Sequence, residues 1–287
     1  MSTDLGYGCA DMTGPLRRVV VRAPSPDSVA AWQAFGWHAE PDAVRIAEEH
    51  DAFRAILDDA GAEVVLAQTP VPLSPDSIYV FDPALMTPHG AVLLRPGKDG
   101  RRVEVDAIAA DLVEAGVPIL GKLEAPATVE GGDTIWLDKR TLLVGIGYRT
   151  NETGVDALRG LLPDVQIHAF DLPHLRGAGD VLHLMSLLSP LDRDLAVAYL
   201  PYVPVRLVQI LEQRGIELVQ VPDEEFWTMG PNVLALGPRV GLALEGNDET
   251  RRRMEAAGVD VRVYSGDELS RKGDGGPTCL TRPILRN

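Results

Sequence analysis

Hydrophobic positions recur at two different spacings along the chain, and their alternation predicts where strands and helices lie. Residues 16–22 read Leu-Arg-Arg-Val-Val-Val-Arg, a run rich in β-branched residues that predicts a strand. Between Pro41 and Gly61 the apolar residues fall on one helical face, and the glycine stands where a helix stop is expected. A second strand is predicted directly afterwards, over residues 63–66.

A longer unit, with two strands before its helix and one strand after it, then recurs four times. The ranges predicted for strand, strand, helix and strand are 77–82, 91–94, 105–115 and 117–120; 134–137, 142–146, 152–162 and 165–169; 181–187, 195–199, 203–214 and 216–221; and 232–236, 240–244, 248–257 and 259–264. The residues that end the predicted helices, Gly61, Gly116, Pro163, Gly215 and Gly258, are 43 to 55 residues apart. A period of this length is typical of a repeat architecture.

Five units predict a closed ring. The strand at 16–22, with its helix, would pair with the strand that follows Cys279 and complete the fifth unit. A ring hides its sheet edges and has an axial channel, which the first strand of each unit faces. An open doubly wound sheet is disfavoured, because a parallel sheet needs one strand per crossover. We therefore predict an α/β fold, a five-bladed propeller of ββαβ-type repeats around a central axis, with residues 15–287 in a single catalytic domain and residues 1–14 as a flexible segment.

The composition limits the classes of partner. The chain has 287 residues, 45% of them hydrophobic, which is ample for a sizeable core. Its 27 Lys and Arg against 42 Asp and Glu give a net charge of −15, which disfavours nucleic-acid and membrane partners and suits a small cationic ligand. No secretory signal or membrane span is recognisable, so we expect a cytoplasmic protein whose Cys9 and Cys279 stay reduced. A homodimer is compatible with these features.

Cys279 is a candidate nucleophile. It follows the Gly- and Pro-rich stretch 273–277, which lets the backbone turn tightly just before a short apolar strand. The alternative is a buried thiol that acts as a small hydrophobe, as most lone cysteines do.

Polar residues on or beside the predicted first strands are the other candidates. They are Asp76, Asp82, Glu130 and His183. Each has a plain structural alternative: Asp76 as a turn residue, Glu130 as a polar hairpin entry, and His183 as a satisfied core histidine.

Together these residues converge on one axis and supply the parts of a covalent mechanism. A thiol, an imidazole and several carboxylates in one cleft can act as nucleophile, acid/base and cation holder. A fixed pair of carboxylates suits a planar guanidinium, which offers forked N–H donors. A metal site is the weaker interpretation, because His168, His174 and His183 do not show a helical ligand spacing.

Several motifs resemble those of the guanidine-modifying enzymes of the pentein fold, and within them the dimethylarginine dimethylaminohydrolases. The resemblance covers nearly the whole chain from Leu16 onward. The motifs that carry it are Pro75-Asp76-Ser77-Ile78-Tyr79-Val80-Phe81-Asp82, Arg95-Pro96-Gly97 to Arg101-Arg102-Val103-Glu104, Glu130-Gly131-Gly132-Asp133, Tyr148-Arg149-Thr150-Asn151, Asp180-Val181-Leu182-His183-Leu184 and Gly275-Gly276-Pro277-Thr278-Cys279-Leu280.

This resemblance implies roles for the reacting groups. Cys279 would be the nucleophile and His183 the acid/base, while Asp82 and Glu130 would grip the guanidinium. No metal or organic cofactor is implied.

The resemblance also implies how the rest of the substrate is held. Asp76 and Tyr79 would form the flanking wall, and Arg101 and Arg149 would meet the α-carboxylate. Met185 stands two residues after the histidine, where arginine deiminases, agmatine deiminases and amidinotransferases typically carry Asp, and this favours the dimethylarginine branch.

The implied reaction converts Nω,Nω-dimethyl-L-arginine and water to L-citrulline and dimethylamine. The Cys279 thiolate would attack the guanidinium carbon, His183 would protonate the departing amine, and water would then displace the sulfur of a thiouronium intermediate. Three alternatives stay open: an arginine deiminase-like hydrolase, an amidinotransferase, and a non-catalytic ribosome anti-association factor of the same five-unit fold.

Overall fold

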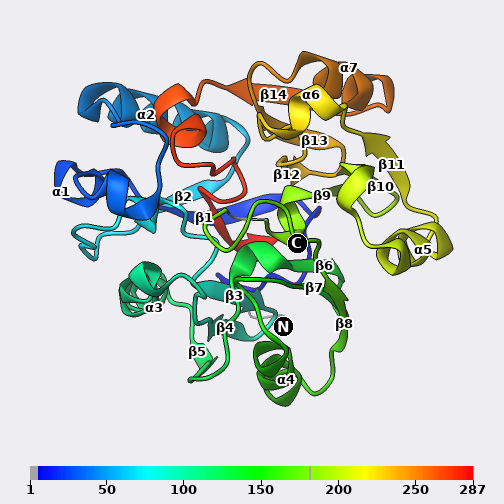
Figure 1. The fold of residues 1–287 in the computed structure, drawn as a ribbon, viewed down its shortest axis with the longest axis horizontal. Coiled ribbons are helices and arrows are strands. Elements are labelled where there is room, and N and C mark those ends of the chain that lie inside the picture. The colour runs from blue at the N-terminus through cyan, green and yellow to red at the C-terminus, as the bar shows by residue number, and fades with distance from the viewer. Residues whose placement is uncertain (1–5, 181, 287) are drawn as a thin grey trace.

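The computed structural model describes residues 6–180 and 182–286. Five three-stranded sheets are arranged around a centre, and the helices α2, α3, α4, α5 and α7 lie at the periphery (Figure 1). In every sheet the middle strand pairs antiparallel with one neighbour and parallel with the other. The predicted five-bladed α/β propeller of repeated units is confirmed.

The boundaries of the five units follow. They are β15 (Arg282–Arg286), β1 (Leu16–Val21), α2 (Ala43–Asp59) and β2 (Glu63–Leu66); β3 (Ala84–Thr87), β4 (Gly90–Leu93), α3 (Val103–Glu114) and β5 (Ile119–Lys122); β6 (Thr134–Asp138), β7 (Thr141–Ile146), α4 (Glu152–Leu161) and β8 (Gln166–Asp171); β9 (Leu188–Asp192), β10 (Leu195–Ala198), α5 (Val205–Gln213) and β11 (Glu217–Gln220); and β12 (Leu234–Gly237), β13 (Val240–Leu244), α7 (Asp248–Ala256) and β14 (Asp260–Tyr264). Two short helices, α1 (Pro26–Val29) and α6 (Asp223–Phe226), lie outside this pattern.

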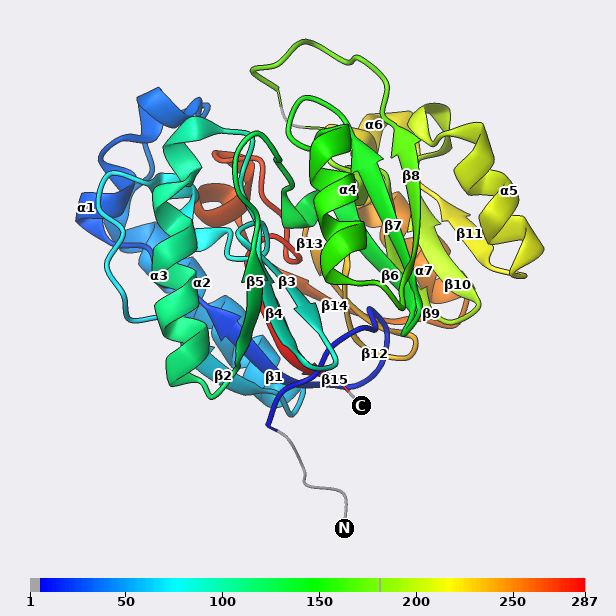
Figure 2. The same ribbon diagram turned by 90° about the horizontal axis from the view of Figure 1, so that it is seen from below.

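The ring closes between the two ends of the chain. The C-terminal strand β15 pairs antiparallel with β1, with Val19 opposite Pro283, as predicted. Figure 2 shows the red β15 beside the blue β1 in a second view. Because β15 begins three residues after Cys279, this closure also fixes where Cys279 lies.

Four of the predicted helix stops have the backbone conformation that favours glycine. Gly61, Gly116, Gly215 and Gly258 have φ between 68° and 87°, in the left-handed region that side chains with a Cβ rarely adopt. These signals therefore placed the ends of α2, α3, α5 and α7 to within two residues.

The first-strand predictions at 77–82 and 181–187 are wrong. A 3₁₀ turn, η2 (Pro75–Ile78), occupies the start of one stretch, and η5 (Leu184–Ser186) occupies the other, while residue 181 lies outside the described residues. The inner strands begin only at Ala84 and Leu188. Where they are described, both stretches are mostly buried and largely apolar, and an apolar run of this length does not distinguish a strand from a buried turn.

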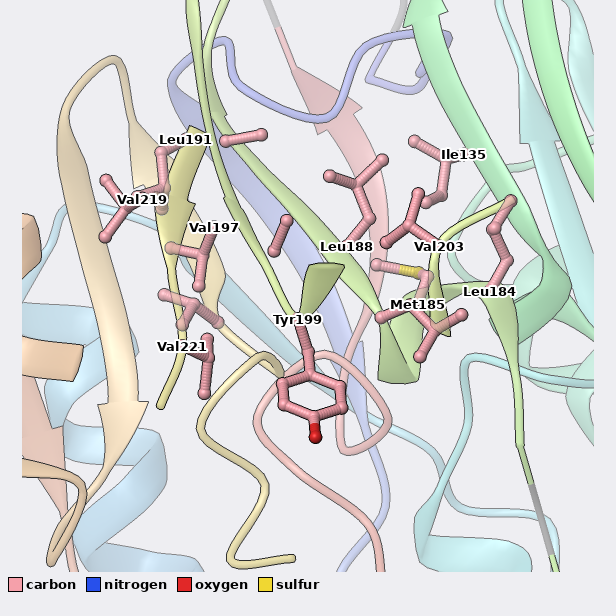
Figure 3. Packing of buried hydrophobic residues seen from close by; sticks show 14 of the residues in the cluster. Ile135, Leu184, Met185, Leu188, Leu191, Val197, Tyr199, Val203, Val219 and Val221 are labelled. Atoms are coloured by element: carbon pink, nitrogen blue, oxygen red, sulfur yellow. The ribbon is translucent and has the colours of Figure 1, made fainter. Parts of the chain in front are cut away.

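The turn η5 is anchored in the hydrophobic core. Leu184 and Met185 pack in the same buried cluster as Leu188 and Val197 of the fourth unit (Figure 3). His183 directly precedes these two core residues and is therefore held at the inner edge of the cluster.

The chain before β1 is packed rather than loose where it is described. The backbone N–H of Gly8 donates to the carbonyl of Ile284 at 2.8 Å, and that of Cys9 donates to the carbonyl of Thr87 at 3.2 Å. Cys9, Ala10 and Thr13 are buried. The prediction of a flexible segment is therefore wrong for residues 8–14, while residues 1–5 lie outside the described part. Among the described residues, no helix is long and apolar enough to cross a bilayer.

Candidate active site

A cavity of about 320 Å³ opens where turns and loops of several units meet. Seven of the eight predicted site residues line it, namely Asp76, Tyr79, Asp82, Arg101, Arg149, His183 and Cys279. The eighth, Glu130, has no exposed surface and lies behind His183. The structure thus brings together groups that are up to 203 residues apart in the sequence.

His183 and Glu130 form a buried hydrogen-bonded pair. The imidazole Nε2 lies 2.7 Å from Oε2 of Glu130. Glycine at position 132 is required here, because a Cβ would lie 2.3 Å from Nδ1 of His183. Burial opposes a charged imidazole, but the carboxylates of Asp133, Asp82 and Glu130 outweigh it and raise the pKa of His183 to about 9. Burial also opposes ionisation of Glu130, yet the hydrogen bond and charge of His183 lower its pKa.

Asp133 is a site residue that the sequence analysis quoted within a motif but did not select. Its Oδ2 accepts from the hydroxyl of Thr150 at 2.6 Å, and its Oδ1 accepts from the backbone N–H of Leu184 at 3.0 Å. Burial raises the pKa of Asp133 to about 6, against the opposing charge of His183. Asp133 therefore fixes the backbone directly after His183 and adds negative charge near the imidazole.

Asp82 faces the cavity and is held from two sides. Its Oδ1 accepts from the backbone N–H of Gly132 at 2.8 Å, and its Oδ2 accepts from Arg101. One ligand atom of Asp82, one of Glu130 and one of His183 all lie within 4.8 Å of one another. A metal ion at this group would have to displace the hydrogen bond between Nε2 of His183 and Glu130.

Arg101 is engaged by protein groups on all sides. Its guanidinium donates to both carboxylate oxygens of Glu104 at 2.8 to 3.1 Å and to Asp82. It also donates to the backbone carbonyls of Asp76 and Tyr79, at 3.2 and 2.9 Å. With 4% of its surface exposed, Arg101 holds the stretch 76–82 in place and has few donors left for a ligand.

Arg149, unlike Arg101, keeps guanidinium donors that the described protein groups do not occupy. It is buried and lines the cavity, and its NH1 group lies 3.5 Å from Oε1 of Glu130. Its remaining donors have no protein partner within the described part of the chain. Of the two arginines predicted to meet the substrate's carboxylate, Arg149 has the free donors.

Asp76 is held by two residues that the sequence analysis did not select. Its Oδ1 accepts from the indole N–H of Trp37 at 2.8 Å, and its Oδ2 accepts from Nζ of Lys98 at 2.6 Å. Trp37 in turn stacks with Tyr79, with the ring centroids 6.1 Å apart. The sequence carried no signal for these contacts, because Trp37 lies in a long connection and lysines are usually solvated.

Cys279 is partly exposed to the cavity and is fixed by its neighbours. Nδ2 of Asn232, another residue without a sequence signal, donates to its Sγ at 3.4 Å, and its carbonyl accepts from the backbone N–H of Phe81 at 3.2 Å. Burial, followed by the charge of Asp82, raises the pKa of the Cys279 thiol to about 11.

The glycines before Cys279 allow the loop to pack closely against neighbouring side chains, and they do not adopt a left-handed backbone conformation. A Cβ on Gly275 would lie 2.1 Å from the ring of Tyr79, so this loop packs directly on that ring. The residue of the loop with a left-handed backbone is Asp274, at φ 58°. The loop is also held by His38, whose Nε2 lies 2.7 Å from the carboxylate of Asp274.

Comparison with known proteins decides the family. The chain matches the sequence model of the arginine deiminase family over residues 74–204 and 199–286. The chain belongs to the arginine deiminase family. Its fold and motifs are those of the guanidine-modifying enzymes with the pentein fold, as the sequence predicted.

The relatives within this family differ in length. Arginine deiminase of Mycobacterium marinum is 32% identical over an alignment of 191 residues that covers 56% of this chain and 47% of that protein, so the chain spans about half the length of the arginine deiminases it matches. N(G),N(G)-dimethylarginine dimethylaminohydrolase of Pseudomonas aeruginosa is 28% identical over 242 residues, 84% of this chain and 89% of that protein.

Solved structures agree with the family assignment. The Pseudomonas aeruginosa dimethylarginine dimethylaminohydrolase in complex with citrulline superposes with a TM-score of 0.78 at 25% identity and covers 95% of this chain and 100% of that chain. The N-terminal domain of ArgZ, a cyanobacterial arginine dihydrolase, reaches a TM-score of 0.81 over 94% of this chain and 98% of that chain, but at 20% identity it shows a common fold alone.

Proposed function

We propose that this protein hydrolyses the guanidinium group of Nω,Nω-dimethyl-L-arginine or a closely related guanidine. The observation that carries the proposal is the placement of Cys279, His183 and Asp82 on one cavity, with Glu130 behind the imidazole. These are a nucleophile, an acid/base and a carboxylate for a cation, which covalent cleavage of a guanidinium C–N bond requires. The similarity to dimethylarginine dimethylaminohydrolase over 84% of the chain supports it.

The protonation states of His183 and Cys279 in the free protein indicate which group acts as the acid and which as the nucleophile in the first step. With a pKa of about 9, His183 is an imidazolium at neutral pH, while Cys279, with a pKa of about 11, is a thiol. A guanidinium bound beside Sγ lowers the pKa of the thiol, which loses its proton to solvent. The thiolate forms a bond to the guanidinium carbon, the C–N bond to dimethylamine breaks, and the proton of His183 goes to the departing nitrogen.

The second step uses the same imidazole in its other form. After the amine has left, His183 is neutral and takes a proton from water, and the resulting hydroxide attacks the carbon of the thiouronium group. As the C–S bond breaks, the hydroxyl proton of the tetrahedral adduct passes to the departing sulfur, which restores the Cys279 thiol and leaves citrulline as the ureido product. In this scheme Glu130 acts on the substrate through its charge and through the orientation of His183.

Arginine itself is the second candidate substrate, with ammonia as the leaving group. The match to the arginine deiminase model favours this candidate. One methyl group in an apolar pocket changes binding by about 1 kcal/mol, so the two candidates must be separated by direct measurement.

A guanidine panel tests the proposal. The protein is incubated with arginine, with its monomethyl and dimethyl derivatives, and with agmatine, and ureido product and free amine are measured together. We expect equal amounts of both products, loss of turnover in Cys279→Ser and retained turnover in Cys9→Ala, which changes the other thiol. Turnover by Cys279→Ser, or no ureido product from any guanidine, would contradict the proposal.

A further inference from the structure

We propose that Lys98 and Arg149 form a carboxylate-binding subsite that offers no partner to an α-ammonium group. The protein should then accept ω-guanidino carboxylic acids at least as well as the corresponding α-amino acids. This inference rests on the proposed guanidine hydrolysis and specifies the substrate class of the same cavity.

The backbone next to Lys98 packs against Arg149, and both side chains line the cavity. The chain at Gly97 packs so closely on Arg149 that a Cβ there would lie 2.5 Å from the carbonyl oxygen of Arg149. The backbone N–H of Lys98 and the NH1 group of Arg149 both contact Oε1 of Glu130, at 3.1 and 3.5 Å. In the proposed subsite, a substrate carboxylate would take the free donors of the Arg149 guanidinium and the one Nζ donor of Lys98 that Asp76 and Phe35 leave free.

Asp76 is the buried carboxylate on this wall that could bind an ammonium group, and Lys98 already neutralises its charge. Asp76 accepts from Trp37 with one oxygen and from Nζ of Lys98 with the other, and Nε of Arg101 lies 3.9 Å from the second oxygen. The ammonium of Lys98 is held further by the carbonyl of Phe35 at 2.7 Å. Lys98 thus occupies the place beside Asp76 that a substrate's α-ammonium would need.

The remaining acidic groups on the cavity do not replace Asp76. Asp82 is bound to Arg101 and to a backbone N–H, and it is assigned to the guanidinium. Asp180 and Asp274 lie at the rim with about half of their side-chain surface exposed, and each faces a cation of its own, Arg176 and His38. Solvent screens such exposed groups strongly.

Charge balance points in the same direction. Glu130 beside Arg149 is paired with His183, so Lys98, Arg149 and Asp76 leave this wall with one net positive charge, which a single carboxylate compensates. An α-amino acid would also bring its α-ammonium group close to the cationic side chains of Lys98 and Arg149. The repulsion between these like charges weakens binding in a partly desolvated site.

Matched pairs of ligands test the inference. We take the guanidinium N-substitution that the panel shows to be hydrolysed fastest. For that guanidine we compare the L-α-amino acid with its deaminated analogue and with its decarboxylated analogue, for example L-arginine with 5-guanidinopentanoate and with agmatine. We expect kcat/KM for the deaminated acid to equal or exceed that of the amino acid, and that of agmatine to be lower by roughly tenfold or more. In Lys98→Met, which frees Asp76, the ratio of amino acid to deaminated acid should rise by roughly tenfold. Lys122→Met removes an exposed lysine paired with Asp106 and should leave the ratio unchanged.

A binding measurement separates this inference from the proposed function. The Kd values of the same ligands for Cys279→Ser are measured by calorimetry, whether or not the wild-type protein turns any of them over. Tighter binding of the amino acid by more than tenfold, with a ratio that Lys98→Met does not change, would overturn the subsite. If the deaminated acid binds as expected but no guanidine is hydrolysed, the subsite is supported and the hydrolase proposal fails.

Discussion

Nε2 of His183 lies 2.7 Å from Oε2 of Glu130, a carboxylate without exposed surface. A buried carboxylate at this distance stabilises the imidazolium and orients its ring. The acid that the proposed first step requires is therefore already present in the free protein at neutral pH. This pair is also the part of the site whose perturbation is easiest to predict.

Glu130→Gln should keep the fold and lose most of the activity. The amide retains the shape of the carboxylate but not its charge, and a charged hydrogen bond contributes about 1.5 to 3 kcal/mol, or roughly tenfold to more than a hundredfold in rate. The pKa of His183, followed by NMR, should fall below its present value of about 9. Glu124→Gln changes an exposed glutamate and serves as control. Activity within twofold of wild type, or an unchanged His183 pKa, would remove Glu130 from the mechanism.

The Cys279 thiol should be slow to react with iodoacetamide at neutral pH. Only the thiolate is alkylated, so the rate should rise about tenfold per pH unit and level off only as pH approaches about 11, the pKa of the buried thiol. The rate is measured by mass spectrometry of the peptide that contains Cys279, which separates it from Cys9. A plateau below pH 8 would show that the thiolate is already stabilised in the free protein.

Asn232→Ala should make this thiol still less acidic. The amide N–H donates to Sγ at 3.4 Å and lowers the pKa of Cys279 against the effect of burial. The same alkylation measurement should therefore give a slower reaction at every pH below the plateau. Asn151→Ala, which removes the N-cap of α4, is a control for the loss of an amide elsewhere. Faster alkylation of the Asn232 variant would mean that the side chain mainly shields the sulfur.

Arg101→Met should act first on stability. Removing this guanidinium leaves the buried carboxylates of Glu104 and Asp82 without their cation, and breaking a buried ion pair in this way costs about 3 to 5 kcal/mol. The free energy of unfolding is measured with urea, and Arg102→Met, whose partner Asp99 is exposed, should change it by less than about 1 kcal/mol. Unchanged stability with a raised KM would instead support the role in binding the substrate's carboxylate that the sequence resemblance implied for Arg101.

The architecture was predictable because its signals are local. Helix-ending glycines and the period of about 50 residues fixed the five units, since a left-handed residue and a helical stripe can be recognised within a few residues. The inner strands were misplaced in two units, because the 3₁₀ turns at Pro75–Ile78 and Leu184–Ser186 are as buried as strands. Asp76, Tyr79 and Asp82 lie on or just after the first of these turns, and His183 directly precedes the second.

The pairing of side chains within the site was not predictable in the same way. Lys98 and Arg101 are three residues apart and both cationic, yet one reaches Asp76 and the other is enclosed by Glu104 and Asp82. Asn232 contacts a sulfur that belongs to a residue 47 positions later. Such contacts depend on how separate units pack, and no local pattern of residue types encodes them.

His183→Gly should separate the two jobs assigned to this histidine. An S-alkyl thiocitrulline releases an alkyl thiol, a leaving group that departs without being protonated, so the first step needs no acid. The variant should still transfer the amidino carbon to Cys279, but it has no base to activate water for the second step.

The covalent adduct should therefore accumulate on the peptide that contains Cys279, whereas the wild-type protein turns the compound over. Gly132 and Asp82 beside the imidazole are unchanged in this variant, so guanidinium binding should persist and can be checked by competition with arginine. If no adduct forms while the ligand is bound, His183 also positions the thiolate. A label on Cys9 instead would show that the nucleophile is wrongly assigned.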